Sequence, residues 1–229
     1  DEGMRTLLLP LAFGLLPLAA GCLTDPSGIR PPSAGPTSPA VDAKGGQQQA
    51  VAAIRKVGGT VGYDLVDLEK TVVGADLHGV RITGAVLDCL GSLTRMRTLN
   101  LYDTDLTDAG LERLRGLTEL RTLNLSATRV TDAGLPCLQS LPALRELYLN
   151  DTPVTDAGLR HLRALPNLRE LALFRTRVTD EGLAGLRGLN NLRKLTLGGG
   201  AITDRGLAYL GDLPDLGELI LLDAHATDA

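Results

Sequence analysis

The chain has 229 residues, of which 44% are hydrophobic and only 3% are aromatic, with no tryptophan. Its core must therefore be filled by leucine rather than by large aromatic side chains, and this favours one small unit repeated many times. The formal net charge of -4 excludes the surplus of clustered Lys and Arg on which nucleic-acid binding depends. We therefore expect no nucleic-acid partner.

Residues 1–21 are predicted to be a lipoprotein-type signal peptide. Arg5 supplies a positive start, the apolar run that follows is too short to span a bilayer, and small residues lead to Cys22. The ending LPLAAGC resembles a bacterial lipoprotein signal, although Ala19 stands where that family prefers Leu. The resemblance implies lipidation of Cys22 and a membrane anchor in the cell envelope, facing the periplasm or the exterior. The alternative is an ordinary secretory signal followed by a chance cysteine.

Residues 22–46 are predicted to form a disordered tether between this anchor and a folded body. Five prolines between Pro26 and Pro39 stand among Ser, Gly and Thr. Such a composition buries too little apolar surface to offset the entropy of ordering the chain.

Residues 47–71 are predicted to be an N-terminal capping segment. Apolar residues follow helical spacing from Ala50 to Val57, and Gly58 and Gly59 then end the helix.

Residues 72–229 repeat every 24 positions without insertion or deletion, as six full units and one truncated unit. The stretch TRVTDAGL from Thr128 returns as TRVTDEGL from Thr176. The threonine that precedes each aspartate marks the period: Thr107, Thr131, Thr155, Thr179, Thr203 and Thr227. A strict period of this length indicates identical units stacked into an array, in which each unit covers its neighbours.

Each unit is predicted to contain a short strand and a short helix. In the LxxLxL segment the fourth and sixth residues point inward, as Leu123 and Leu125 do in one unit. The threonine of the Thr-Asp pair is predicted to cap the helix, and the aspartate to complement the helix dipole. The glycine two residues later, Gly134 in the same unit, is predicted to let backbones pack closely.

The pattern resembles the leucine-rich repeat, in a variant similar to the cysteine-containing subclass and its bacterial relatives. The usual pattern places Asn or Cys three residues after the last strand leucine, where its side chain bridges adjacent backbones. Threonine stands there in this chain, and we expect its hydroxyl to bridge more weakly: Thr104, Thr128, Thr152 and Thr176. The resemblance implies an α/β fold, a right-handed solenoid with a parallel sheet on the concave face and short helices on the convex face.

The sequence predicts no enzyme, no cofactor and no metal site. His78, His161 and His225 fall at different positions of different units, and none pairs with a serine or carboxylate at catalytic spacing. Cys89 and Cys137 share one position two units apart, at least ~9–10 Å, which is too far for a disulfide. Zinc sites bring four ligands at characteristic spacing, and that spacing does not occur here.

The outward residues of the strands vary from unit to unit while the leucines do not, and this contrast predicts a binding surface for a protein or glycan partner. We call these residues the strand face: Thr98, Asn100, Tyr102, Thr122, Asn124, Ser126, Glu146, Tyr148, Asn150, Glu170, Phe174, Lys194 and Thr196. Tyr102, Tyr148 and Phe174 are the rigid aromatic groups that anchor interfaces.

One arginine stands at the entry to each of five strands. We call this set the arginine column: Arg97, Arg121, Arg145, Arg169 and Arg193. Guanidinium groups match planar oxyanions, so the column predicts an anionic partner. The other interpretation, which we favour from sequence alone, is a solvated edge whose charges pair with Glu146, Glu170 and nearby acids.

Together these features predict an exported, lipid-anchored leucine-rich-repeat binding protein. One alternative is the substrate-recognition module of an F-box-type ubiquitin ligase, since the repeats are similar to those of that class. Another is a set of accessory repeats beside an enzyme domain beyond residue 229. The last predicted strand leaves Ile220, Leu221 and Leu222 without a following unit, which fits either a fragment or an edge that a partner covers.

Overall fold

The computed structural model describes residues 43–66, 69–198 and 202–222. All of these belong to one compact unit, Ala40–Ala229. The predicted signal peptide, Cys22, most of the predicted tether and His225 lie outside the described residues.

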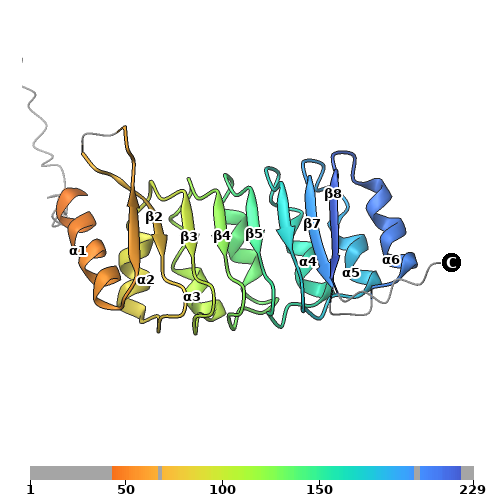
Figure 1. The fold of residues 1–229 in the computed structure, drawn as a ribbon, viewed down its shortest axis with the longest axis horizontal. Coiled ribbons are helices and arrows are strands. Elements are labelled where there is room, and N and C mark those ends of the chain that lie inside the picture. The colour runs from red at the N-terminus through yellow and green to blue at the C-terminus, as the bar shows by residue number, and fades with distance from the viewer. Residues whose placement is uncertain (1–42, 67–68, 199–201, 223–229) are drawn as a thin grey trace, which may run out of the picture. The chain divides into compact units, whose positions relative to one another are not determined.

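Eight strands form one sheet in chain order (Figure 1). The first two pair antiparallel, and every later pair is parallel with a register shift of 24 residues, as in Leu99 opposite Leu123. The parallel part confirms the predicted stacking of strands. The strands are β1 Thr60–Tyr63, β2 Val72–Asp76, β3 Thr98–Asn100, β4 Thr122–Asn124, β5 Glu146–Tyr148, β6 Glu170–Ala172, β7 Lys194–Gly198 and β8 Glu218–Leu222.

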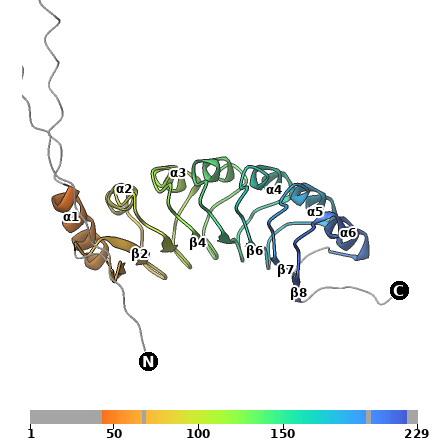
Figure 2. The same cartoon turned by 90° about the horizontal axis from the view of Figure 1, so that it is seen from above.

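Short helices line the outer, convex side of the repeats, and the strands line the inner side (Figure 2). The α-helices are α1 Ala43–Lys56, α2 Gly84–Gly91, α3 Asp108–Glu112, α4 Asp156–Leu162, α5 Asp180–Leu183 and α6 Asp204–Ala208. The 3-10 helices are η1 Leu135–Ser140, η2 Ala184–Leu186 and η3 Tyr209–Asp212. None of the helices in the described ranges is long and apolar enough to cross a membrane.

Leucine fills the space between the strand layer and the helix layer. Leu123, Leu125, Leu147, Leu149, Leu171 and Leu173 are all at most 1% exposed, as the repeat pattern predicts. Each burial stabilises the fold by about 1.5–3 kcal/mol, but only because the units on either side cover the same side chain. The stacked leucines therefore join the units into one continuous core.

The four predicted backbone bridges do not form as expected. Each threonine hydroxyl donates to the carbonyl three residues earlier in its own unit: Thr104 to Leu101, Thr128 to Leu125, Thr152 to Leu149 and Thr176 to Leu173, at 2.6–2.8 Å. A hydroxyl is too short to reach the neighbouring backbone, so it closes a turn within the unit. All four threonines are buried.

The residue just before each of these threonines has a left-handed backbone, which the sequence did not predict. The residues are Asp103, Ala127, Asp151 and Arg175, with φ of 53° to 55°. Their amides continue the parallel hydrogen bonding beyond the strand, as when Ala127 N donates to Asn150 O at 2.8 Å. The sheet geometry therefore imposes a conformation that L side chains disfavour.

The N-terminal cap is more extensive than predicted. α1 begins at Ala43, four residues earlier than the predicted start, despite two glycines in its first turn. β1 then adds an antiparallel strand beside β2, an element that the sequence analysis did not predict. Gln47 of α1 ties this helix to the start of β2, since its side-chain amide donates to Lys70 O and accepts from Val72 N.

Candidate binding surface

The structure brings the strand-face residues together on the inner side of the sheet. Register places Thr98, Thr122, Glu146, Glu170 and Lys194 in one row across β3 to β7. A second row runs through Asn100, Asn124, Tyr148, Ala172 and Thr196. Positions 24 residues apart in sequence thus become lateral neighbours, which is the property that makes a broad contact surface.

A hollow of about 420 Å³ opens at the N-terminal half of this surface. The small side chains of β1 and β2 at Gly62, Gly74 and Ala75 leave this space unfilled. Its lining comprises Thr60, Val61, Gly62, Gly74, Ala75, Asp76, Thr98, Leu99, Asn100, Thr122, Asn124 and Tyr148. Gly74 lies against β3 so closely that an added Cβ would fall 2.5 Å from the Thr98 hydroxyl. The contribution of β1 and β2 to this hollow was not predicted, because β1 lies outside the 24-residue repeat.

Asp76 organises the polar groups at the end of β2. Its Oδ1 accepts from Asn100 Nδ2 at 2.9 Å and lies 3.0 Å from His78 Nδ1. Burial by itself would raise the pKa of Asp76. The hydrogen bonds and charge of His78, together with the hydrogen bond from the Asn100 amide, outweigh burial and lower that pKa. His78 thus contacts a carboxylate two residues earlier through the turn that follows β2, a local contact that the sequence pattern did not indicate.

Tyr148 lies between two carboxylates at the centre of the strand face. Burial raises the pKa of its phenol most, and the charges of Glu170 and Glu146 and hydrogen bonds to them raise it further. Glu146 also accepts from the Thr122 hydroxyl at 3.0 Å, and Glu170 lies 3.8 Å from Lys194 Nζ. This cluster is held in place by its own hydrogen bonds and ion pair, and it gives the centre of the face an acidic character.

Three strand-face residues differ in their exposure to solvent. Ser126 is only 3% exposed, and its hydroxyl accepts from Asn150 N at 3.2 Å, so it supports the face rather than presenting a contact. Tyr102 is 45% exposed. Phe174 is partly covered by its neighbour Arg175, whose guanidinium carbon lies 4.9 Å from the ring centre.

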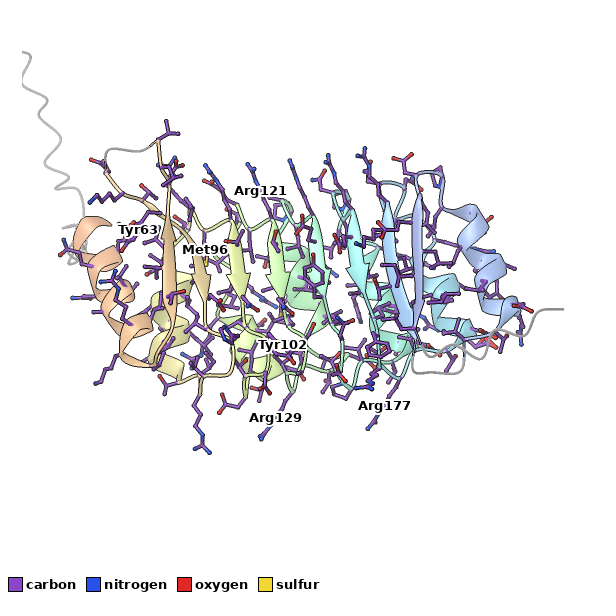
Figure 3. The ribbon with its side chains drawn as sticks, viewed as in Figure 1. Tyr63, Met96, Tyr102, Arg121, Arg129 and Arg177 are labelled. Atoms are coloured by element: carbon purple, nitrogen blue, oxygen red, sulfur yellow. The ribbon has the colours of Figure 1, made fainter. Side chains whose placement is uncertain are left out.

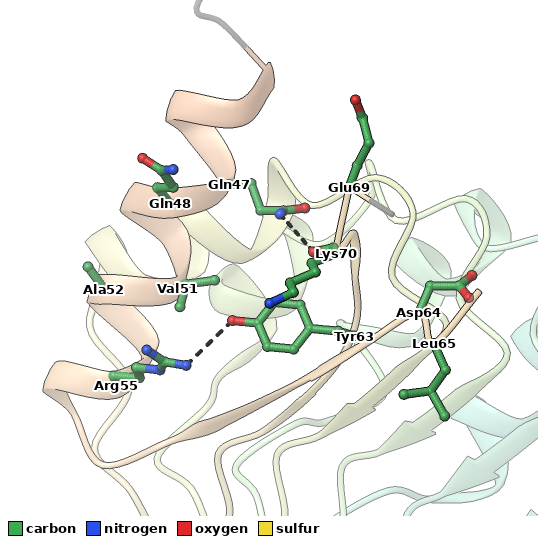
Figure 4. Close-up of a pocket in the computed structure, with 10 residues that line it drawn as sticks. All are labelled: Gln47, Gln48, Val51, Ala52, Arg55, Tyr63, Asp64, Leu65, Glu69 and Lys70. Carbon is green, nitrogen blue, oxygen red and sulfur yellow. Dashed lines mark hydrogen bonds between the residues drawn. The ribbon is translucent and has the colours of Figure 1, made fainter. Parts of the chain in front are cut away.

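A larger cavity of about 970 Å³ lies between α1 and the end of β1 (Figure 4). Its polar wall includes Arg55, whose guanidinium donates to the Tyr63 hydroxyl at 3.4 Å. Leu65 and Val66, which follow β1, are 99% and 91% exposed. The sequence analysis did not predict this cavity, because it arises from the packing of α1 beside the unpredicted strand.

Cys89 and Cys137 stand at the same position of two units. Cys89 and Cys137 are free, and among the described residues no group of three or more His, Cys, Asp or Glu could hold a metal ion. The Cys137 thiol donates to Glu112 Oε2 at 2.6 Å, and Arg115 lies 3.9 Å from its sulfur. Burial raises the pKa of Cys137 most, and Glu112 raises it further against the opposing effect of Arg115.

Each arginine of the column directly precedes the first residue of a strand from β3 to β7, and Figure 3 shows Arg121 at that edge of the sheet. Arg97 pairs with Asp64 at 3.3 Å, and its Nε is buried without a hydrogen-bond partner. The predicted pairing of the column with Glu146 and Glu170 is wrong. Within the described ranges no carboxylate lies within 4.0 Å of Arg121, Arg145, Arg169 or Arg193, because Glu146 and Glu170 point onto the strand face.

Comparison with known proteins agrees with this geometry. Residues 164–186 and 188–211 each match the family described as Leucine Rich repeat. No curated protein matches the sequence significantly.

Two solved structures from Listeria monocytogenes share the fold. Internalin C2 is 23% identical, with a TM-score of 0.54 over 79% of this chain and 86% of that protein. The internalin InlF is 22% identical, with a TM-score of 0.51 over 80% of this chain and 57% of that protein. These comparisons and the parallel sheet with its outer helices lead to one conclusion: the fold is a leucine-rich-repeat solenoid.

Proposed function

We propose that the protein is an exported, lipid-anchored leucine-rich-repeat protein whose strand face binds a protein partner. The observation that carries the proposal is the contrast between scaffold and surface. From β3 to β7 the inward residues are leucine in every unit, whereas the row beginning at Asn100 carries Asn, Asn, Tyr, Ala and Thr in successive strands. A scaffold that repeats while its exposed row changes presents one specific surface.

The character of that surface fits a folded protein better than a small molecule. The hollow is open to solvent, and aromatic side chains stand at three places along the face, at Tyr102, Tyr148 and Phe174. Tyr102 and Tyr148 are rigid amphipathic groups that contribute contact area at low entropic cost. The acidic centre at Glu146 and Glu170 would favour a partner with a basic patch.

Affinity capture with two matched variants tests the strand face. Asn124→Arg together with Tyr148→Ala alters the centre of the face, and Gln139→Arg adds the same charge on the helix side at an exposed residue of η1. Proteins captured from a cell-envelope extract by the unaltered chain should be lost with the first variant and kept with the second. Equal capture by both variants, with unchanged circular dichroism, would contradict the proposal.

The lipid anchor rests on LPLAAGC and needs its own test. Palmitate should label the unaltered chain, and Cys22→Ser should abolish the label and release the protein from the membrane fraction. Globomycin should cause the uncleaved precursor to accumulate. Cys89→Ser serves as the control, since it removes a thiol without touching the signal. Labelling that survives Cys22→Ser would rule out this anchor.

A further inference from the structure

We propose that one edge of the sheet is a binding site for a linear anionic polysaccharide with a charged group on each sugar. The site is formed by Arg121, Arg145, Arg169 and Arg193, which we call the four free arginines. They stand where β4, β5, β6 and β7 begin, away from the centre of the strand face. This proposal is therefore independent of the protein-binding proposal.

Backbone hydrogen bonds hold the four free arginines at a constant spacing. The amide of each donates to the carbonyl of the arginine one unit earlier, at 2.7–2.8 Å from Arg97 through to Arg193. Neighbouring parallel strands lie about 4.8 Å apart, so the arginine α-carbons follow that interval. The result is an evenly spaced row of cations on the backbone of the sheet rather than a set of charges on a loop.

The four free arginines are not paired with described carboxylates, although the chain contains more acidic than basic residues. The four free arginines are exposed, and no described carboxylate lies within 4.0 Å of any of them, in a chain with 27 acidic and 23 basic residues. Arg97 at the N-terminal end of the column is neutralised by Asp64, which marks where the free row begins. Like charges held side by side repel, and an external polyanion would relieve that repulsion.

The opposite edge of the sheet provides a contrast. Arg129 and Arg177 are also exposed, and Figure 3 shows them on the side away from Arg121. They lie two units apart, with Pro153 at the equivalent position between them. The cationic row is therefore a property of one edge only.

The spacing favours a polysaccharide over an acidic peptide. In an extended peptide, side chains on one side repeat about every 6.8 Å, and over three intervals this departs from the arginine spacing by roughly 6 Å. A sugar ring advances its polymer by roughly one inter-strand spacing, and in a twofold ribbon every second ring turns its carboxylate to the same side, so these carboxylates stay in step with alternate guanidinium groups of the row. Duplex DNA would require a basic face, whereas the protein offers a single row.

Binding of fluorescent polygalacturonate oligomers to the 229-residue chain tests the proposal, with fluorescence anisotropy as the readout at low and at physiological salt. Arg145→Gln with Arg169→Gln should raise Kd at least about tenfold, because two charge-assisted contacts are lost. The matched variant Arg129→Gln with Arg177→Gln removes the same charge and should change Kd less than about twofold. Tyr148→Ala alters the strand face and should leave polysaccharide binding unchanged, so the two proposals are tested separately.

Three results would overturn the inference. The first is no binding of polygalacturonate at low salt by a chain whose circular dichroism is intact. The second is an equal loss of affinity in the two arginine variants, which would indicate nonspecific attraction. The third is tighter binding of poly-glutamate of matched charge, which would assign the edge to acidic peptides.

Discussion

Asp108 holds Thr131 of the next unit by two hydrogen bonds. Its Oδ1 accepts from Thr131 N and its Oδ2 from Thr131 Oγ1, both at 2.7 Å. The same pair recurs between Asp132 and Thr155, and in the two units that follow. The aspartate predicted to complement a helix dipole therefore has a second task, since it links consecutive units on the convex side.

This link also orients the cap of the next helix. A threonine hydroxyl that donates to the preceding aspartate has its lone pairs free for the amide two residues on, as in Thr155 accepting from Ala157 N at 3.3 Å. Gly84 replaces the aspartate before Thr107, and Thr107 makes no side-chain cap bond. The predicted cap is also absent at Thr203, which Asp180 holds, so the link is not sufficient for a cap.

Removal of one link should weaken the whole array. Asp156→Ala deletes both hydrogen bonds to Thr179, and we expect the free energy of unfolding to fall by about 2 kcal/mol. Urea denaturation followed by circular dichroism measures this. Glu119→Ala removes an exposed carboxylate and should stay within about 0.5 kcal/mol. Equal effects would mean that the link contributes nothing beyond surface charge.

The glycine of the repeat should be coupled to that aspartate. A Cβ at Gly182 would clash with Asp156 Oδ1, so Gly182→Ala should destabilise the protein by about 1–3 kcal/mol. At an ordinary helical position the same change would stabilise by roughly 0.5–1 kcal/mol. In the Asp156→Ala background most of the penalty should vanish, because the clashing carboxylate is gone. A double-mutant cycle with additive free energies would contradict this account.

The link should depend on pH through the aspartate. Burial would raise the pKa of Asp180, but hydrogen bonds from Thr203 and the charge of Arg205 outweigh it and lower the pKa below its ordinary value of 3.8. A lowered pKa contributes stability above the ordinary pKa, and this is lost as pH falls through the folded-state value. The stability advantage of the native chain over Asp180→Asn should therefore shrink between pH 7 and about pH 3. An advantage unchanged by acid would show that the charge is unimportant.

A left-handed residue offers a stabilising substitution. Ala127 has φ of 55°, which costs an L residue roughly 1–2 kcal/mol, whereas glycine adopts it freely. After the entropy that glycine loses on folding, Ala127→Gly should still raise the free energy of unfolding by about 0.5–1 kcal/mol. The control is Ala157→Gly in the first turn of α4, which should destabilise. Destabilisation by both substitutions would show that the turn is not strained.

The Cys137 thiol should react slowly with alkylating agents. Burial and Glu112 raise its pKa above the ordinary 9.0, so little thiolate forms near neutral pH. In a chain that also carries Cys22→Ser and Cys89→Ser, Glu112→Gln should lower that pKa and speed iodoacetamide alkylation at about pH 8.5. Glu119→Gln should leave the rate unchanged. An unaltered rate in Glu112→Gln would mean that burial alone protects the thiol.

The strands and the core could be predicted because the same residue type recurs at the same position of each unit. Leucines at fixed positions predicted the strands, their parallel stacking and the inward columns, and burial of Leu147 and Leu171 confirms that prediction. The strand face was also readable, because side chains alternate along a strand. Ser126 was the exception, since its burial depends on Asn150 in the next unit.

Other features were decided by contacts between units. The link from Asp108 to Thr131, the turn at Ala127, the hydrogen bond of Asp76 with Asn100 and the hollow beside Gly74 all join segments that the repeat pattern treats separately. β1 does not follow the 24-residue period, so the repeat pattern could not predict that it pairs with β2.

The sequence by itself determined that the chain builds a stack of equal coils around leucine, because hydrophobic periodicity dictates which side chains leave water. Only the tertiary structure decided which polar groups meet across the coils, and therefore which charges are neutralised. Arg97 finds Asp64 and the four free arginines find no described acid, because partner choice depends on distance in space and not on position in the repeat.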